Sequence, residues 1–304
     1  MVSVTKLSKT YPKAKSPAVD SISFEVAEGE LFGLVGPDGA GKTTLFRMLT
    51  TLLLPDTGSA TVDHSDIVKD YRQIRRSVGY MPGRFSLYQD LTVEENLKFF
   101  ATIFGSTIQE NYDLIKDIYI HLEPFKNRRA GKLSGGMKQK LALCCALIHK
   151  PKVLFLDEPT TGVDPVSRKE FWEMLKRLKQ QRITIMVSTP YMDEATLCDR
   201  IALIQDGKIL AINDPDSIIK QYPENLYAVR SAAIPRLLLD LRRYENTLSC
   251  FTFGEYLHLT FRQDDARAIP AMKYYLESNN HEGIEIMPVV PTIEDCFIHL
   301  LKQP

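Results

Sequence analysis

The stretch from Leu31 to Leu45, LFGLVGPDGAGKTTL, limits the folds open to this chain more than any other part of the sequence. The run Leu31–Val35 is apolar but too short for a helix, so it predicts a buried strand of a parallel sheet. Apolar residues then recur at helical spacing from Lys42 to Leu52, which predicts a helix. A buried strand that leads directly into a helix is typical of α/β folds, in which helices cover a parallel sheet.

The turn between that strand and helix, GPDGAGKT from Gly36 to Thr43, fits a phosphate-binding loop. Glycine lets successive backbone N–H groups approach a polyphosphate because no Cβ stands in the way, and the helix dipole points its positive end to the same place. Lys42 can reach the β- and γ-phosphates, and the Thr43 hydroxyl can ligate Mg²⁺. An ordinary glycine turn is the alternative, but the position between strand and helix favours a site for a nucleoside triphosphate. Its candidate residues are Gly36, Pro37, Asp38, Gly39, Ala40, Gly41, Lys42, Thr43 and Thr44.

A further apolar strand, KVLFLDEP from Lys152 to Pro159, ends in two acidic residues. Asp157 can hold Mg²⁺ through its water shell, and Glu158 can polarise the water that attacks the γ-phosphate. A strand that runs into a polar turn is the simpler alternative. Because a phosphate-binding loop precedes it on the same chain, we predict that Asp157 binds the metal and that Glu158 is catalytic.

Glycines also open the segment LSGGMKQ from Leu133 to Gln139, which precedes the helical run Lys140–His149. Ser134, Gly135 and Gly136 would allow a close backbone approach at a helix N-terminus and so form a second anion site. A loop that ends in a helix cap is the alternative for these residues. A second phosphate site on one chain becomes meaningful when a nucleotide is bound between two subunits.

Length, charge and composition limit the remaining possibilities. With 304 residues the chain is long enough for two domains, and its 38 basic and 38 acidic residues give no net charge, so nucleic acid is not an expected partner. No apolar run approaches the ~20 residues of a membrane-spanning helix, and the N-terminus has no apolar segment like that of a signal peptide. The five cysteines lack metal-ligand spacing, so we expect buried, reduced thiols in a cytosolic protein.

We expect a first domain over residues 1–220, in which short apolar strands alternate with helices around a largely parallel sheet. A clear further strand is Ile183–Ser188, and residues 201–212 predict a closing hairpin. The signal over residues 91–147 is helical throughout and predicts a helical subdomain. The sequence Thr92-Val-Glu-Glu95 predicts a capping box at its start.

The segment Gln221–Asn225 combines proline with polar residues and predicts a boundary, after which residues 226–304 form a small α+β domain. None of its segments carries a catalytic group of residues. Its expected strands are Tyr227–Val229, Cys250–Phe253 and Leu257–Phe261, and its expected helices are Arg236–Arg243, Ala266–Leu276 and Pro291–Leu301.

The order of these segments resembles that of ATP-binding-cassette (ABC) ATPases: phosphate loop, LSGGMKQ segment, Asp157-Glu158 strand, and then Thr161-Gly-Val-Asp164. The match covers residues 1 to about 215 and is most similar to the separate ATPase subunits of drug- and antibiotic-export transporters. The ending Pro291–Leu301 is similar to the accessory tail of that group. The resemblance implies a P-loop NTPase fold, ATP and Mg²⁺ as cofactors, and ATP hydrolysis that drives transport. It also implies membrane-spanning permease subunits as partners and a location on the cytoplasmic face of the cell membrane.

The same resemblance assigns further roles. Tyr11 would stack on adenine, although packing is the simpler role for an aromatic residue. Ser134 and Gly136 would contact the γ-phosphate held by a facing second ABC ATPase subunit, and Asp164 would lie at the interface between the two. The region Arg84–Glu95 corresponds to the part of the family that docks permease subunits.

Two positions depart from the family pattern. Gly83 stands where the family usually has a glutamine that touches Mg²⁺ and the attacking water, and Pro190 stands where it has a histidine that contacts the γ-phosphate. Proline offers neither a side-chain donor nor a backbone N–H, and termination of the strand is its alternative role. Asp38 replaces a common asparagine, and its charge would weaken phosphate binding slightly. We therefore expect ATP to bind at this chain's own site and to turn over slowly.

Three functions remain after these observations. The leading hypothesis is the ATP-driven subunit of an exporter, working as a heterodimer in which Ser134 and Gly136 complete the fast site of a different partner. A non-hydrolysing regulatory subunit is the second hypothesis. The third is a non-transport machine built on the same cassette, but such proteins usually carry two cassettes or a long coiled coil, and this sequence shows neither.

Overall fold

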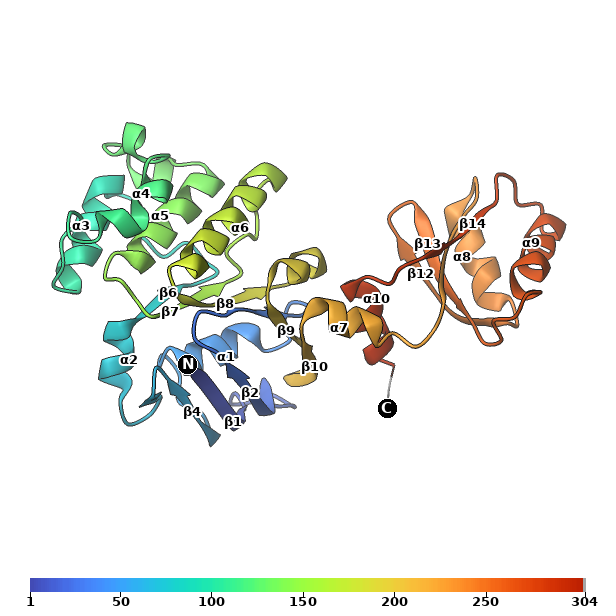
Figure 1. Ribbon diagram of the computed structural model, residues 1–304, viewed down its shortest axis with the longest axis horizontal. Coiled ribbons are helices and arrows are strands. Elements are labelled where there is room, and N and C mark those ends of the chain that lie inside the picture. Colours follow the sequence, from blue (N-terminus) through green and yellow to red (C-terminus); the bar gives the residue numbers. More distant parts are fainter. Residues whose placement is uncertain (303–304) are drawn as a thin grey trace. The chain divides into compact units, whose positions relative to one another are not determined.

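The computed structural model describes residues 1–302 (Figure 1). Contacts between residues divide the chain into two compact units, the first from Met1 to Ile218 and the second beginning at Ile219. Each unit has its own cluster of buried apolar side chains. Among the described residues, no helix has both the length and the apolar character that crossing a membrane requires.

The main sheet of the first unit contains β3 (Leu31–Val35), β6 (Val78–Met81), β7 (Val153–Asp157), β8 (Thr184–Thr189), β9 (Arg200–Gln205) and β10 (Lys208–Asn213). Its six strands lie in the order β10-β9-β3-β8-β7-β6. Neighbouring strands from β9 to β6 run parallel, which confirms the predicted α/β fold with a parallel core. The antiparallel pair β9 and β10 confirms the hairpin predicted at residues 201–212.

The parallel direction brings the expected site residues to one edge of this sheet. The phosphate loop follows β3, Asp157 ends β7, and Pro190 follows the last residue of β8. Gly83 comes shortly after the end of β6. The carboxyl ends of parallel strands are where open α/β sheets bind their ligands, so the topology alone gathers these residues.

A second sheet of the first unit corrects the expectation of one largely parallel sheet. It contains β1 (Val2–Lys9), β2 (Val19–Val26), β4 (Thr57–Val62) and β5 (Ser65–Asp66), all antiparallel, in the order β2-β1-β4-β5. Along β2, the buried residues Ile22, Phe24 and Val26 alternate with exposed ones. Such alternation is the mark of a strand with one buried face, and an expectation based on continuous apolar runs misses it.

Helix α1 (Lys42–Leu49) shares one buried cluster with both sheets. Its Phe46 meets Phe155 of β7 edge to face, with ring centres 5.6 Å apart. The helix ends before the predicted Leu52, because Thr50 caps it and donates its hydroxyl to the carbonyl oxygen of Phe46 at 2.8 Å. Leu52 is consequently exposed rather than part of the helical apolar face.

The other helices of this unit are α2 (Tyr71–Ser77), α3 (Val93–Ile103), α4 (Tyr112–Tyr119), α5 (Gly135–Leu147) and α6 (Pro165–Gln180), with 3-10 turns η1 (Glu123–Phe125), η2 (Ala130–Lys132) and η3 (Met192–Leu197). Helix α7 (Pro215–Lys220) spans the division between the units. Residues 91–147 are therefore interrupted by loops rather than helical throughout. The predicted capping box is confirmed, because Thr92 Oγ1 accepts the N–H of Glu95 at 3.2 Å and the Glu95 carboxylate accepts the N–H of Thr92 at 2.7 Å.

The second unit pairs a four-stranded antiparallel sheet with helices. The strands β11 (Leu226–Arg230), β12 (Thr247–Phe253), β13 (Tyr256–Phe261) and β14 (Glu285–Val289) lie in the order β12-β13-β11-β14, and the helices are α8 (Ile234–Arg243), α9 (Ala268–Ser278) and α10 (Ile293–Leu300). Strand β14 is missing from the sequence-based expectation. It lies at the sheet edge, is mostly exposed and contains Pro288, so it has neither the apolar run nor the residue types of a central strand.

All five cysteines are buried, and none forms a disulfide in the part of the chain that the structure describes, as predicted. Burial raises the pKa of Cys250 and Cys296 to about 11, so both thiols stay protonated at neutral pH. Burial also raises the pKa of Cys144 and Cys145. A raised pKa leaves little reactive thiolate, so these four cysteines are packing residues rather than nucleophiles.

Candidate nucleotide site

Close backbone contacts explain the glycines at both ends of the phosphate loop. A Cβ on Gly36 would lie 2.1 Å from the carbonyl oxygen of Ile204, and a Cβ on Gly41 would lie 2.1 Å from that of Ala18. Gly41 also has φ +105°, a conformation that strains any L side chain. These two glycines therefore fix the path of the backbone that leads into α1.

Lys42 is a buried cation that is surrounded by acceptors. Its side chain is 2% exposed, and its Nζ donates to the carbonyl oxygens of Gly36 at 2.8 Å and Pro37 at 2.9 Å. The third neighbour is Glu158, whose Oε1 lies 3.2 Å from Nζ. A buried ammonium needs acceptors for its three N–H groups, and this arrangement supplies them from the loop and from the residue after β7.

Two oxygens that suit a hard divalent cation face each other below the loop. Thr43 Oγ1 lies 3.2 Å from Asp157 Oδ1, and Ser188 Oγ donates to the same Asp157 oxygen at 2.6 Å. Magnesium sites that also use substrate phosphates commonly take one carboxylate and one hydroxyl from the protein, so these residues fit Mg²⁺. Burial and, to a smaller extent, the charge of Asp157 raise the pKa of nearby Tyr80 to about 12, so Tyr80 adds no negative charge.

Glu158 is held in an unusual backbone conformation. Its φ is +49°, and its N–H donates to the carbonyl oxygen of Ser188 at 3.1 Å and to Ser188 Oγ at 3.0 Å. Gly83 lies against the same turn, because a Cβ there would be 3.1 Å from the carbonyl oxygen of Asp157 and 3.8 Å from the Cβ of Glu158. Gly83, where the sequence resemblance implies a glutamine in other members of the family, is thus adjacent to both acids.

Pro190 lies next to the start of the phosphate loop. The carbonyl oxygen of Thr189, the residue before it, accepts the N–H of Gly36 at 3.2 Å. Proline brings no donor to this position, so the end of β8 offers the cavity no side-chain hydrogen bond from residue 190.

Tyr11 and the phosphate loop line one cavity of about 270 Å³. Tyr11 is 37% exposed, and its hydroxyl lies 3.3 Å from Thr44 Oγ1 at the start of α1. The structure thus brings together residues that are widely separated in the sequence. The residues that line the cavity are Tyr11, Ala18, Gly39, Gly41, Lys42, Thr43, Thr44 and Glu158.

Ser134, Gly135 and Gly136 lie elsewhere on the first unit. The Ser134 hydroxyl accepts the N–H of Met137 at 3.3 Å and so caps α5. A Cβ on Gly136 would lie 2.8 Å from Ser167 Oγ, so this segment contacts the first turn of α6. Asp164 caps α6 by accepting the N–H of Ser167 at 3.0 Å. These residues do not line the cavity beside Lys42.

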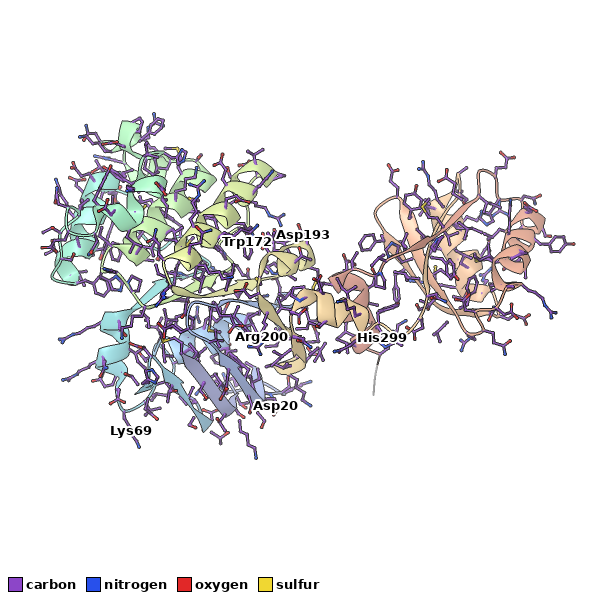
Figure 2. The ribbon with its side chains drawn as sticks, in the orientation of Figure 1. Asp20, Lys69, Trp172, Asp193, Arg200 and His299 are labelled. Carbon is purple, nitrogen blue, oxygen red and sulfur yellow. The ribbon has the colours of Figure 1, made fainter. Side chains whose placement is uncertain are left out.

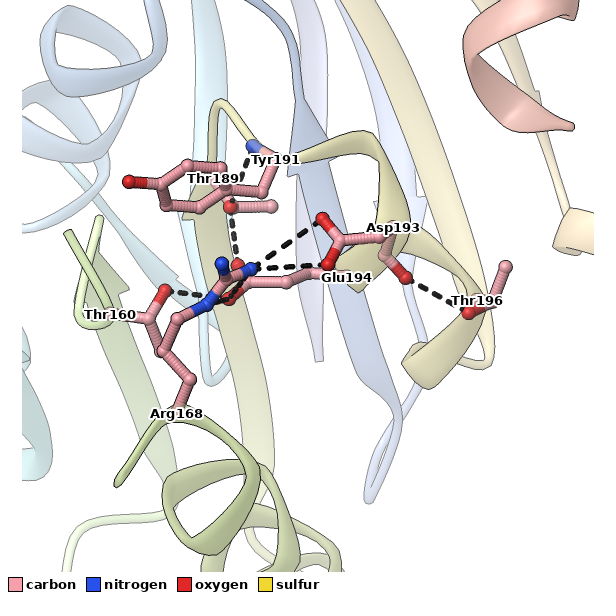
Figure 3. A network of polar contacts seen from close by, with 7 residues as sticks. All are labelled: Thr160, Arg168, Thr189, Tyr191, Asp193, Glu194 and Thr196. Carbon is pink, nitrogen blue, oxygen red and sulfur yellow. Dashed lines mark hydrogen bonds and ion pairs between the residues drawn. The ribbon is translucent and has the colours of Figure 1, made fainter. Parts of the chain in front are cut away.

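Sequence reasoning missed Ser188 and a buried polar group around Glu194 (Figure 3). Ser188 follows an almost continuous apolar run at the end of β8, and a polar residue in that position was a usable signal, since it pairs in register with Asp157. For Glu194 the sequence gives no signal, because its partners Thr160 and Arg168 come from distant segments.

Fold and site together define the class of the protein: a P-loop nucleotide-binding cassette. Residues 19–161 match the family described as "ABC transporter". The chain is 38% identical over 310 residues to the "Probable multidrug ABC transporter ATP-binding protein YbhF" of Escherichia coli (strain K12), covering 99% of this chain and 52% of that protein. It is 34% identical to the "Nod factor export ATP-binding protein I" of Rhizobium sp. (strain N33), covering 93% of this chain and 91% of that protein.

Among solved structures, the chain is similar to an ATP-binding cassette in a dimeric post-hydrolysis state bound to ADP and Pi. The TM-score is 0.64 at 25% identity, covering 70% of this chain and 98% of that one. The chain therefore belongs to the ATP-binding proteins of the ABC transporter family, as the resemblance implied. It spans about half the length of YbhF and most of the Nod factor export protein.

Proposed function

We propose that this chain binds Mg·ATP in the cavity beside the phosphate loop and hydrolyses it as the ATP-binding subunit of an export-type ABC transporter. The observation that carries the proposal is the meeting of Lys42, Thr43, Asp157 and Glu158 at one edge of the parallel sheet. The export relative and the cassette with bound ADP and Pi support it.

Each part of the cavity has a proposed role in binding. Tyr11 stacks on the adenine ring, and Thr43 Oγ1 and Asp157 Oδ1 hold the metal. Bound Mg²⁺ neutralises charge on the β- and γ-phosphates. The phosphates are held by the backbone of the loop and the start of α1, that is, by Gly36, Pro37, Asp38, Gly39, Ala40, Gly41, Lys42, Thr43 and Thr44.

The Lys42–Glu158 ion pair is expected to break when nucleotide binds in the cavity. The γ-phosphate competes with Glu158 for the Lys42 ammonium, because an anionic phosphate is the better acceptor in a cavity that Lys42 already faces. The Glu158 carboxylate is then free to accept a hydrogen bond from water and to take its proton as that water attacks the γ-phosphate. Glu158 is the proposed catalytic residue.

A second ABC subunit is required to complete this site. Ser134, Gly135 and Gly136 lie outside the cavity of their own chain, at the exposed start of α5, where they are available to a γ-phosphate held by a facing subunit. Asp164 caps α6 beside them and lies in the proposed interface.

We propose that the second subunit is a different chain. Gly83 and Pro190 flank the acids and the phosphate loop without supplying side-chain donors, so two copies of this chain would form two slow sites. In a heterodimer, this chain's Ser134 and Gly136 complete a partner site that has those donors. The same observation favours one alternative, a regulatory subunit that binds ATP without hydrolysing it.

A groove on the first unit is the proposed contact for membrane-spanning permease subunits. It has a volume of about 190 Å³ and includes Met81 and Leu87 near the end of β6, with Phe100 and Phe104 from the α3 region. Leu87 belongs to the segment Arg84–Glu95 that the family resemblance assigns to docking. An apolar segment of a permease would fill this groove and hold the chain at the cytoplasmic face of the membrane.

Binding of a fluorescent ATP analogue to the isolated chain tests whether the cavity binds Mg·ATP. We expect saturable binding with Mg²⁺ and weaker binding after chelation with EDTA. Co-purification with permease chains from membranes tests the transporter role. A chain that binds no ATP, or that stays unattached when its permeases are present, would contradict the proposal.

A further inference from the structure

A buried carboxylate outside the cavity joins three segments that border the nucleotide site (Figure 3). Glu194, in η3, is 2% exposed. Its Oε1 accepts hydrogen bonds from Thr160 Oγ1 at 2.8 Å and from Arg168 Nε at 3.1 Å, and its Oε2 accepts one from Thr189 Oγ1. We call these four residues the Glu194 network. Burying a charged carboxylate costs desolvation free energy unless donors surround it, so the fold depends on these contacts to keep Glu194 buried.

The network fixes the chain on both sides of Pro190. Thr189, before the proline, donates to Glu194 and accepts the N–H of Tyr191 at 3.1 Å. The Arg168 guanidinium lies over the Tyr191 ring, 4.2 Å from its centre. Arg168 also pairs with Asp193 at 3.2 Å, but that carboxylate is 76% exposed and lies at the surface of the first unit (Figure 2). Surface pairs contribute little, so the contact with Glu194 is the one that matters.

The same network holds the loop from Glu158 to Asp164 near its start and at its end. Thr160 is two positions after Glu158 and is 1% exposed. Arg168 lies in the first turn of α6, where its N–H donates to the carbonyl oxygen of Asp164 at 2.9 Å. One carboxylate thus fixes a loop that begins with the proposed catalytic residue.

Glu158 needs such support because its backbone is strained. A residue other than glycine rarely adopts φ +49°, and it keeps that conformation only where its surroundings enforce it. Ser188 holds the N–H of Glu158 on one side. On the other side, the Thr160 hydroxyl is held by Glu194.

We propose that Glu194 is a positioning residue for ATP hydrolysis. It holds the loop from Glu158 to Asp164 so that Glu158 keeps the conformation in which its carboxylate reaches Lys42. Glu194 acts through Thr160 and Arg168 and contacts no nucleotide. The inference rests on the proposed function of the cavity, because it assigns Glu194 a task in that reaction.

The test uses Thr160→Val, which keeps the shape of the side chain and removes one donor, together with Thr160→Ser, which restores the hydroxyl. ATP hydrolysis is measured in a single turnover with protein in excess, and ATP affinity is measured by equilibrium binding. We expect Thr160→Val to lower the single-turnover rate about 10-fold or more, because small misplacements of a catalytic group are costly. ATP affinity should stay within about twofold, and Thr160→Ser should recover most of the rate.

Hydrogen exchange supplies a readout that does not depend on activity. In Thr160→Val, amide exchange over residues 158–164 should rise while that of β3 and α1 stays at the wild-type level. Arg168→Lys tests the same contact from the other side and should give the same pattern, which also covers the case in which Thr160→Val fails to fold. Lys179→Met is the matched control, since it removes a cation from the same helix and its 2.6 Å pair with Asp199.

The outcomes separate the inference from the proposed function. Unchanged turnover in both Thr160→Val and Arg168→Lys would overturn the positioning role, as would a rate loss that is matched by Lys179→Met. Unchanged exchange over residues 158–164 would overturn it as well. A wild-type chain that binds no ATP would overturn the proposed function instead, while the exchange measurement would still report on the loop.

Discussion

Strand β7 and the strands on either side of it, β6 and β8, end at the same edge of the main sheet with different chemistry. Asp157 ends β7 and Glu158 follows it, and both side chains contact the start of α1 through Thr43 and Lys42. After β6 and β8 come Gly83 and Pro190, which carry no polar side chain. Under the proposed function, ATP binding depends on the phosphate loop and β7, and fast hydrolysis depends on the ends of β6 and β8.

Strand β8 still supports the acids at the end of β7 through a hydroxyl within it. Strand β8 places Ser188 beside Asp157 and Glu158, and Thr189 contacts the buried Glu194. The Ser188 hydroxyl holds Asp157 and Glu158 in place, but neither Ser188 nor Thr189 lines the cavity beside the phosphate loop. Ser188 therefore supports both acids from β8, while residues 83 and 190 bring no polar side chain to this edge of the sheet.

The largest effect is expected from a variant that tests whether this chain completes the ATP site of its partner subunit, even though its own ATP site lacks side-chain donors at residues 83 and 190. In the full complex, Ser134→Arg should lower ATP hydrolysis by about 10²–10³-fold, because it blocks the donors that a γ-phosphate on the facing subunit needs. Steady-state ATPase activity of the purified complex is the measurement. Ser59→Arg, which adds the same charge to an exposed position of β4, is the control. An ATPase rate of the complex that is unchanged by Ser134→Arg would show that this chain contributes nothing to the fast site.

The next effect concerns binding, which the comparison assigns to the phosphate loop and β7. Lys42→Ala should weaken ATP affinity by roughly 10²-fold or more, because it removes a buried cation that pairs with charged partners. Equilibrium binding of a fluorescent ATP analogue measures this loss. Lys179→Ala, at the far end of α6, should leave the affinity unchanged. Equal affinities for wild type and Lys42→Ala would remove the basis of the proposed site.

Restoring side-chain donors at the ends of β6 and β8 should raise the rate of ATP hydrolysis rather than lower it. Gly83→Gln combined with Pro190→His should raise turnover at this chain's own site by about 10²-fold, since single preorganised donors are commonly worth 10²–10³ in rate. The matched Gly83→Ala and Pro190→Ala variant should show no gain, because it adds side-chain atoms without donors. A Cβ at residue 83 would lie 3.1 Å from the carbonyl oxygen of Asp157, so a small backbone shift accompanies the change. Equal rates in the two double variants would contradict the account.

The smallest effect concerns the support that β8 gives to β7. Ser188→Ala removes the hydroxyl that donates to Asp157 at 2.6 Å and accepts the N–H of Glu158. We expect Mg²⁺-dependent ATP affinity to fall about 10-fold, because outer groups orient metal-binding carboxylates. Titration of ATP binding with Mg²⁺ measures the change. Affinity that is lost equally without Mg²⁺ would point to general destabilisation rather than to the orientation of Asp157.

Continuous apolar strands and glycine-rich turns were readable from the sequence because they carry local signals. The strand before Gly36, the acids after β7 and the cap at Thr92 all belong to this group. Strands β2 and β14 were missed because one alternates buried with exposed residues and the other is an exposed edge with a proline. Their places depend on pairing with distant segments, which a local pattern does not report.

The candidate site shows the same limit. Order along the chain predicted Lys42, Thr43, Asp157 and Glu158, and the structure brings them to one place. The contact of Lys42 with Glu158 and the positive φ of Glu158 depend on three-dimensional geometry and had no sequence signal. Glu194 was invisible for the same reason, because its partners come from a loop, a helix and a strand end.

The central claim is that β7 and the phosphate loop bind ATP while the ends of β6 and β8 leave its hydrolysis slow. The most direct test follows the fate of radiolabelled ATP in a single turnover by the isolated wild-type chain, at protein concentrations at which two copies pair and each site has the facing subunit it requires. The account predicts that ATP binds with Mg²⁺ and is converted to ADP at least about 10²-fold more slowly than a typical enzymatic rate of about 10 s⁻¹. Bound ATP that is hydrolysed by the isolated chain at about 10 s⁻¹ would contradict it.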